Sequence, residues 1–225
     1  YGQSFPDAVT MLLGGEQGQI YRESRKVEPE PPKPFLLPEA NPDMRRVFAY
    51  LTGTRCLDRS VVKAFVKAKM IYEDAAYHNA VFVGYDLDGV PRHAHKRGTY
   101  TKGEPFKGNV DGCDPRYSFH WIGKSDMVYV FEAPIDLLSF ISLYQKDWRM
   151  HSYVALCGVA EHALLQLLSD ASQVKRIALC LDNDKAGLQA RERIKQSLAE
   201  RGYRDVFQLF SQQKDWNEDL QALTK

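Results

Sequence analysis

Three acidic residues are spaced so that they could meet at one end of a parallel sheet. Glu132 follows the apolar run 127–131, and Asp182 and Asp184 follow the apolar run 177–181. Functional groups of a parallel sheet gather at the carboxyl ends of its strands, and residues two apart on an extended segment point to the same side. Clustered carboxylates repel one another, and a divalent cation relieves that repulsion. The acids therefore predict a Mg²⁺ (or Mn²⁺) site that can bridge phosphate oxygens.

An alternating pattern of strands and helices predicts the sheet that would carry these acids. Strands are expected at 127–132, 153–156, 176–182 and 206–210, and helices at 134–147, 160–169 and 185–201. Continuous apolar strands separated by helices of crossover length are typical of a parallel arrangement. The sequence thus predicts an α/β fold with a four-stranded, mainly parallel sheet flanked by helices.

A D-x-D pair also has a purely structural explanation. Asp184 could be the N-cap of the helix expected at 185–201, and Asp182 could be a solvated carboxylate. The order of features favours the functional interpretation. A strand that ends in Glu132 is followed fifty residues later by a strand that ends in D-x-D-x-x-G.

Two segments resemble the signature motifs of toprim domains. They are FEAPID at 131–136 and LCLDNDKAG at 179–187, which are similar to the E-G-x-x-D and D-x-D-x-A-G motifs of bacterial primases. The resemblance implies catalytic and metal-binding roles for Glu132, Asp182 and Asp184, and a further metal-binding role for Asp136. Ala133 stands where the family motif has Gly.

A third segment resembles the K-D-P-D-E motif of the same primases. It is KDWNE at 214–218, in which Asp215 matches the first acid and is implied as a metal ligand. Asn217 replaces the second acid, so a second metal position there is not implied.

A basic region precedes the toprim-like part. Residues 43–107 contain 12 Lys and Arg against 7 Asp and Glu. Helices are expected at 43–53 and 58–69, the second with Asp58 as its N-cap. Strands are expected at 79–85 and 90–97 around an Asp-Gly turn, followed by a loop at 98–118. The strand-turn-strand resembles the primase segment that ends in a nucleic-acid-binding motif. The implied nucleic-acid-binding residues are Arg92, His95, Lys96 and Arg97, and Lys185 beside the D-x-D pair is a further candidate.

The remaining residues suggest the domain organisation. Residues 1–23 contain SFPDAV at 4–9, which resembles the helix that follows the zinc-binding module of primases. The resemblance implies that zinc would be bound only in a module missing from this chain. Six prolines make 24–42 a predicted linker. An α+β subdomain is then expected at 43–125 and a toprim domain at 126–225.

Composition excludes some classes of protein. The sequence has no apolar run of about 18 residues, which a membrane span requires. Its four cysteines form no C-x-x-C pair, and we expect a cytoplasmic protein with free thiols. His93, His95, Cys113 and His120 could bind a metal, but phosphate or solvent contacts are the favoured interpretation. No P-loop motif is present.

The preferred hypothesis is a Mg²⁺-dependent primase-like nucleotidyltransferase that synthesises primers on a DNA template for a plasmid or mobile element. Its partners would be single-stranded DNA and nucleoside triphosphates, with replication or conjugation proteins as further possibilities. Two alternatives remain open at this point. One is a toprim nuclease that uses the same ions, and the other is a non-catalytic single-stranded DNA-binding module.

Overall fold

The computed structural model describes residues 34–224, apart from 102, 105 and 159. The predictions for residues 1–33, which are the N-terminal helix and most of the linker, lie outside these described residues. The described end of the linker is extended, and the Asn41 amide donates a hydrogen bond to the Glu73 carbonyl at 2.8 Å. The domain boundaries expected from the sequence remain predictions.

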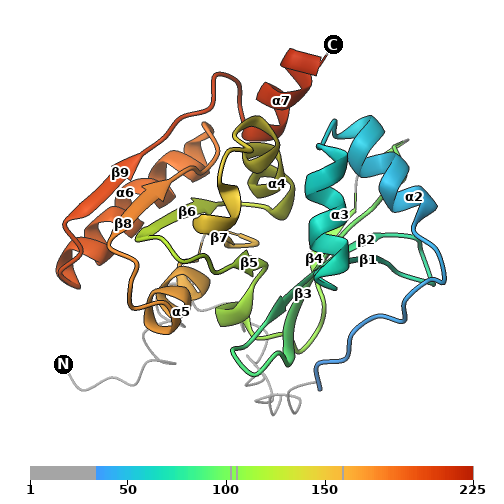
Figure 1. Ribbon diagram of the computed structural model, residues 1–225, viewed down its shortest axis with the longest axis horizontal. Coiled ribbons are helices and arrows are strands. Elements are labelled where there is room, and N and C mark those ends of the chain that lie inside the picture. Colours follow the sequence, from blue (N-terminus) through green and yellow to red (C-terminus); the bar gives the residue numbers. More distant parts are fainter. Residues whose placement is uncertain (1–33, 102, 105, 159, 225) are drawn as a thin grey trace, which may run out of the picture. The chain divides into compact units, whose positions relative to one another are not determined.

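The first of two sheets is small and antiparallel (Figure 1). Its strands, in the order β1-β2-β3-β4, are β1 (Ile71–Glu73), β2 (Ala80–Tyr85), β3 (Pro91–Arg97) and β4 (Lys107–Asn109). The strand-turn-strand expected at 79–97 is confirmed, and Gly89 has the positive φ of 76° that its turn requires. The prediction of a loop over 98–118 is wrong in part. Lys107–Asn109 pairs with β3, and Pro115–Tyr117 forms a 3-10 turn, η2.

Short helices cover this sheet. They are α2 (Arg45–Phe48), the π-helical turn η1 (Ala49–Thr54) and α3 (Arg59–Lys67). The prediction of two helices here is confirmed with tighter bounds. Asp58 is the N-cap of α3, since its Oδ1 accepts hydrogen bonds from the amides of Ser60 at 2.8 Å and Val61 at 3.1 Å.

The second sheet has five strands in the order β5-β7-β6-β8-β9. The four expected strands are β6 (Met127–Phe131), β7 (Ser152–Ala155), β8 (Arg176–Leu179) and β9 (Asp205–Gln208). They are mutually parallel, which confirms the α/β prediction. The two-residue strand β5 (His120–Trp121) extends the edge antiparallel to β7, and a strand so short carries no sequence pattern of its own.

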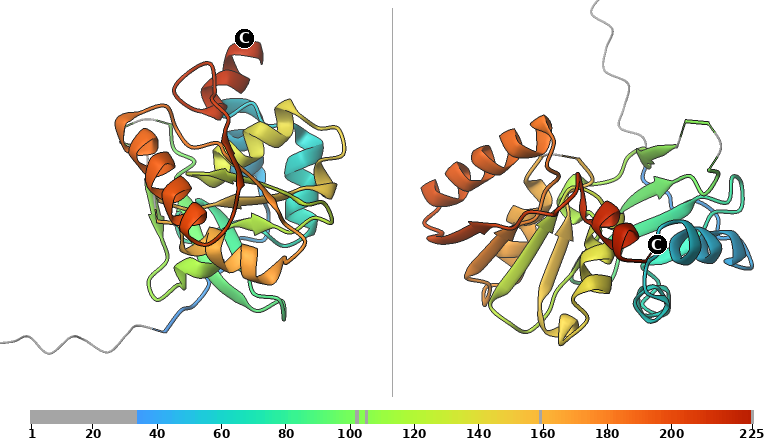
Figure 2. Two further views of the ribbon diagram at one scale, coloured as in Figure 1. Left: turned by 90° about the vertical axis from the view of Figure 1, so that its left-hand side faces the viewer. Right: turned by 90° about the horizontal axis from the view of Figure 1, so that it is seen from above.

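Helices lie on both faces of this sheet (Figures 1 and 2). They are α4 (Pro134–Leu143), α5 (His162–Asp170), α6 (Lys185–Glu200) and α7 (Trp216–Thr224). Alternation along β6 divides the core, because Val128 and Val130 pack with α5 and α6, whereas Met127 and Phe131 pack with α4 and α7. The expected helix at 134–147 ends early. A separate 3-10 turn, η3 (Trp148–Met150), follows it after Asp147, which has a positive φ of 54°.

The α4 side of the large sheet shares its core with the helices of the small one. Phe65 of α3 stacks on Trp148 with ring centroids 5.4 Å apart, and the ring centroids of Phe65 and Phe119 are also 5.4 Å apart. One continuous apolar cluster thus fixes the two sheets relative to each other. Within the described residues, the helices are too short or too polar to cross a membrane.

Candidate active site at the strand ends

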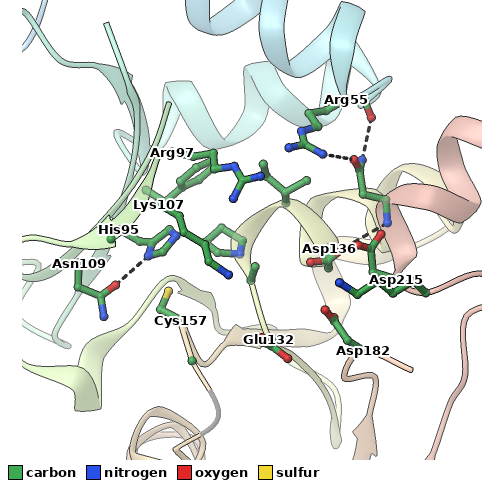
Figure 3. Close-up of a pocket in the computed structure, with 18 residues that line it drawn as sticks. Arg55, His95, Arg97, Lys107, Asn109, Glu132, Asp136, Cys157, Asp182 and Asp215 are labelled. Carbon is green, nitrogen blue, oxygen red and sulfur yellow. Dashed lines mark hydrogen bonds between the residues drawn. The ribbon is translucent and has the colours of Figure 1, made fainter. Parts of the chain in front are cut away.

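A pocket of about 390 Å³ opens where the carboxyl ends of β6 and β8 face the small sheet (Figure 3). Acidic side chains line one part of it and cationic side chains another. The acids are Glu132, Asp136, Asp182 and Asp215, and the basic residues are Arg55, His95, Arg97, Lys107 and Lys214. Two of the three strand-end acids predicted from the sequence, Glu132 and Asp182, therefore share one cavity with residues from the other sheet.

Glu132 and Asp182 reach the pocket from two neighbouring strands. β6 and β8 are paired in parallel, and the Cys180 amide extends the ladder by donating to the Val130 carbonyl at 2.8 Å. Both strands therefore end at the same level. Burial, followed by the negative charge of Glu132, raises the pKa of Asp182 to about 7. Burial, followed by the charge of Asp184, raises the pKa of Glu132.

Asp136 and Asp215 meet the pocket from the first turn of α4 and the residue before α7. Asp136 is buried, and burial together with the charge of Asp215 raises its pKa well above the usual range. Its Oδ1 accepts a hydrogen bond from the Asn217 amide at 3.2 Å. The start of α7 is fixed in place because the Trp216 indole donates to the Cys180 carbonyl at 2.9 Å.

Asp184 has a different position from the other acids. Its Oδ1 caps α6 by accepting from the Gly187 amide at 3.0 Å, and its Oδ2 lies 3.9 Å from the Lys214 ammonium. It does not line the pocket, but its charge contributes to the raised pKa values of Glu132 and Asp182. Gly187 is required here, since a Cβ at this position would collide with the Asp182 backbone.

The loop that carries the D-x-D pair is held by a buried arginine. The Arg191 guanidinium donates to the Leu181 carbonyl and to Asn183 Oδ1, the latter at 3.1 Å, and stacks on Phe210. Asn183 in turn donates to the Ser211 carbonyl at 2.8 Å. The middle residue of the D-x-D pair therefore ties its loop to the segment that leads to Lys214 and Asp215.

The carboxylates fit a divalent cation by the chemistry of their oxygens. Glu132 Oε2 and Asp182 Oδ1 are buried and have no hydrogen-bond partner among the described residues. A buried, unpaired carboxylate oxygen is costly unless a cation or a proton satisfies it. In the described part of the chain, no three His, Cys, Asp or Glu side chains form a ready-made ligand set. Mg²⁺ needs only one or two carboxylates, because waters and substrate phosphates complete its coordination.

The residues of β3 that were predicted to bind nucleic acid lie on two different faces of the strand. His95 and Arg97 point from β3 toward the pocket, whereas Arg92 and Lys96 lie on the other face of the strand. Arg92 Nε donates to Asp86 Oδ2 at 2.7 Å, and the Lys96 ammonium lies 5.5 Å from the centre of the Phe106 ring. Lys185 is exposed and lies outside the pocket.

Sequence reasoning missed several residues of the basic wall. Lys107 and Asn109 belong to the unpredicted strand β4, and Asn109 Oδ1 lies 2.7 Å from His95 Nδ1. Arg55 follows η1, and its guanidinium donates to Asn217 Oδ1 at 3.1 Å across 162 positions of sequence. Of the missed residues, only Lys214 had a signal, since it opens the KDWNE segment. The His/Cys metal alternative has no converging ligand set among the described residues. His93 of this set is buried on β3, and burial lowers its pKa to about 4.

Comparisons with known proteins agree with this geometry. Residues 129–220 match the family described as Toprim-like, and residues 49–125 match a family described as a protein of unknown function (DUF3991). The chain is 26% identical over 247 residues to the uncharacterized protein pXO2-78 of Bacillus anthracis, covering 99% of this chain and 70% of that protein.

Solved primases share the fold. The primase fragment of the bacteriophage T7 primase-helicase superposes with a TM-score of 0.58 at 18% identity, covering 85% of this chain and 75% of that one. The DnaG primase catalytic domain bound to single-stranded DNA superposes with a TM-score of 0.55 at 16% identity, covering 81% of this chain and 71% of that one. The chain therefore carries a Toprim-like domain within a primase-like fold, as the motifs predicted.

Proposed function

We propose that this chain, with its Toprim-like domain in a primase-like fold, is a Mg²⁺-dependent nucleotidyltransferase that synthesises primers on single-stranded DNA. The observation that carries the proposal is the composition of the pocket. Carboxylates with unpaired oxygens lie on one side, and Arg97 and Lys107 from a separate sheet lie on the other. This combination suits a triphosphate that is bound through both a metal ion and direct cationic contacts.

Each side of the pocket has its own role in this proposal. Glu132, Asp182 and Asp215 hold the divalent ion, with Asp136 behind them and Asp184 contributing charge. Bound Mg²⁺ would supply charge neutralisation and orientation of the phosphate oxygens. Arg97 and Lys107 hold phosphates of the nucleotide or template, since guanidinium and ammonium groups bind phosphate without reading sequence.

Glu132 has an environment that also suits proton transfer. Its carboxyl group is half-buried, and its raised pKa brings it closer to neutral pH. In the proposed reaction a 3′-hydroxyl loses its proton and attacks the α-phosphate of the bound nucleotide, the bond between the α- and β-phosphates breaks, and pyrophosphate leaves. Glu132 then either binds the ion or accepts the hydroxyl proton, and either role requires its carboxylate at the strand end.

The proposed biological role is replication or transfer of a plasmid or mobile element, with replication or conjugation proteins as partners. The similarity to the Bacillus anthracis protein supports that setting. We keep residues 43–125 as the proposed nucleic-acid-binding subdomain and 126–225 as the proposed metal-binding domain. Zinc has no proposed site in the described residues.

A primer-synthesis assay tests the proposal. The full chain is incubated with unlabelled single-stranded DNA, labelled nucleoside triphosphates and Mg²⁺, and products are separated by size. We expect labelled oligonucleotides with Mg²⁺ and none with EDTA. Asp182→Ala and Glu132→Ala should each reduce product at least 100-fold, in the range expected for loss of metal-ion catalysis, about 10² or more. Asp205→Ala, at an exposed position on β9, is the matched control. Full synthesis by the Asp182→Ala, Glu132→Ala double variant would refute the proposal.

A second candidate is a non-catalytic single-stranded DNA-binding module. The absence of a ready-made ligand set among the described residues favours it, as does Asn217 in place of an acid. DNA binding would then be unaffected by EDTA and by Asp182→Ala, and no labelled product would form. With end-labelled DNA, the same incubation distinguishes a nuclease from the nucleotidyltransferase and from the binding module, because only a nuclease shortens the DNA.

A further inference from the structure

Exposed aromatic side chains gather at the end of the small sheet that borders the pocket. Tyr77 is 77% exposed, Tyr100 is 73% exposed and Phe106 is 50% exposed. They come from the β1–β2 turn and from the β3–β4 loop, which lie at the same end of the antiparallel sheet. We call these three residues the aromatic edge. Of the other large exposed aromatics in the described chain, Tyr144 follows α4 and Phe210 packs on Arg191.

The backbone that presents Tyr77 is fixed. The buried Asp74 carboxylate accepts hydrogen bonds from the Tyr77 amide at 2.7 Å and from the Asn79 side chain at 2.8 Å. The Thr99 hydroxyl donates to the His78 carbonyl at 2.8 Å, which ties this turn to the segment that leads to Tyr100. The turn is therefore held in one conformation while its aromatic ring remains in solvent.

Phe106 is held beside a glycine. The Gly98 amide donates to the Phe106 carbonyl at 2.9 Å. A Cβ at position 98 would lie 3.2 Å from the Phe106 Cβ, so glycine leaves room for the close approach. The Lys96 ammonium lies 5.5 Å from the centre of the Phe106 ring. The ring is thus positioned by its surroundings and still half-exposed.

The aromatic edge adjoins the basic wall of the pocket at this end of the small sheet, although the Phe106 ring lies with Lys96 on the face of the sheet away from the pocket. Lys107 follows Phe106 in the chain and lines the pocket, as does Arg97, which precedes Gly98. Figure 3 shows Arg97 and Lys107 together on the side of the small sheet, opposite Asp182 and Asp215. A flexible ligand that contacts the aromatic edge and passes around this end of the sheet reaches Arg97 and Lys107 next and the carboxylates after them.

We propose that the aromatic edge is a stacking platform for the unpaired bases of a single-stranded nucleic acid that enters the pocket. Such a strand offers flat base faces and regularly spaced phosphates, which match aromatic rings followed by cations. Duplex bases are already stacked on each other and offer no free faces. The inference deepens the proposed function and rests on its nucleic-acid substrate, but it concerns binding and needs no catalysis.

The test compares an oligothymidylate with an abasic oligonucleotide of the same length and charge. Binding of each fluorescein-labelled strand to the full chain is measured by anisotropy in EDTA at fixed salt. The native protein should bind the oligothymidylate about tenfold more tightly or better, given the size of stacking contributions. Tyr100→Leu combined with Phe106→Leu should remove that preference and leave affinity for the abasic strand unchanged. Tyr144→Leu is the matched control and should keep the preference.

Two results would overturn the inference. One is equal affinity of the native protein for the two strands. The other is a preference that survives the double substitution, which is the result expected if the aromatic edge contacts a protein instead. Circular dichroism of the double variant checks its fold, and Tyr77→Leu provides an independent variant of the same surface. Because the binding assay contains EDTA, failure of primer synthesis contradicts only the proposed function, whereas equal affinity of the native protein for the two strands contradicts only the platform.

Discussion

At the residue scale, two carboxylates of the pocket have oxygens that no hydrogen bond of the described protein satisfies. Glu132 and Asp182 each keep one buried oxygen without a hydrogen-bond partner among the described residues. Burial and the charges of neighbouring carboxylates raise both pKa values, to about 7 for Asp182. A cation stabilises carboxylates in this condition, which is why we propose a binding role for them and not a structural one.

His93 allows a pH-dependent prediction away from these acids. Its imidazole on β3 is buried, its Nδ1 has no partner within the described residues, and burial lowers its pKa to about 4. The charges that face it are those of His95, Asp114 and His120. The unfolded chain binds a proton at His93 more readily than the folded chain does. The contribution of the neutral imidazole to the free energy of unfolding is therefore complete above the unfolded pKa of about 6.5 and is lost as the pH falls toward 4.

We expect His93→Leu to flatten the dependence of unfolding free energy on pH between 6.5 and 4. Between these two pH values, the native protein should lose at most about 3 kcal/mol more of its unfolding free energy than His93→Leu does. Urea denaturation at several pH values measures it, and His162→Leu, which removes an exposed imidazole, is the control. A pH dependence that is the same in the native protein and in His93→Leu would contradict this assignment.

Only part of the site could be predicted at this scale. Glu132 and Asp182 follow apolar runs directly, so their convergence needs only the rule that parallel strands end together. Lys107 and Arg55 have no such signal, because each reaches the pocket through contacts between segments far apart in sequence. The period of two along β3 could have separated Arg97 from Lys96, since alternate residues of a strand face opposite sides.

At the element scale, Asn217 joins α7 to the helical turn of the other subdomain. Its Nδ2 donates to the Arg55 carbonyl and to the Ser139 hydroxyl, both at 2.9 Å, and its Oδ1 accepts from the Arg55 guanidinium. A carboxylate could not supply the Nδ2 donors. The replacement of a motif acid by Asn217 thus gives this chain a buried connection between η1, α4 and α7.

We expect Asn217→Ala to lower the free energy of unfolding by about 2–3 kcal/mol, since it leaves buried polar groups without partners. Gln221→Ala removes an exposed hydrogen bond to the Thr54 carbonyl and a 3.2 Å hydrogen bond to Asn217 Oδ1, but it leaves the Arg55 and Ser139 contacts of Asn217 in place, and should cost about 1 kcal/mol or less. Chemical denaturation measures both. Equal, small losses for the two variants would show that the Asn217 contacts do not stabilise the connection.

Elements with strong patterns were predictable, and very short ones were not. The four parallel strands, α3 with its Asp58 cap and α6 were expected from periodicity and cap residues. β1, β4 and β5 have three residues or fewer, and their pairing partners define them more than their own side chains do. Propensity is a weak guide in such segments because tertiary contacts decide their conformation.

At the scale of the whole described unit, the two expected subdomains share one hydrophobic cluster. Phe65 of α3 packs against Trp148 and Phe119, and the cluster continues to α4 and α7. The predicted boundary near residue 125 therefore does not divide this hydrophobic core.

We expect Phe65→Ala to destabilise both subdomains together by about 3–5 kcal/mol, the usual cost of removing a buried phenylalanine. Residues 126–225 produced alone should bind a hydrophobic dye and lack a cooperative thermal transition. Leu87→Ala, at an exposed turn position, is the control for the full chain. A cooperative transition of the isolated 126–225 fragment would contradict the shared core.

The most direct test of the account measures Mn²⁺ binding to the full chain by electron paramagnetic resonance, without nucleotide or DNA. The native protein should bind Mn²⁺, and Glu132→Gln and Asp182→Asn should each weaken that binding at least tenfold. Asp205→Asn removes an exposed carboxylate from β9 and should leave binding unchanged. Identical Mn²⁺ binding by the native protein and the Glu132→Gln, Asp182→Asn double variant would contradict the claim that these strand-end carboxylates hold the ion.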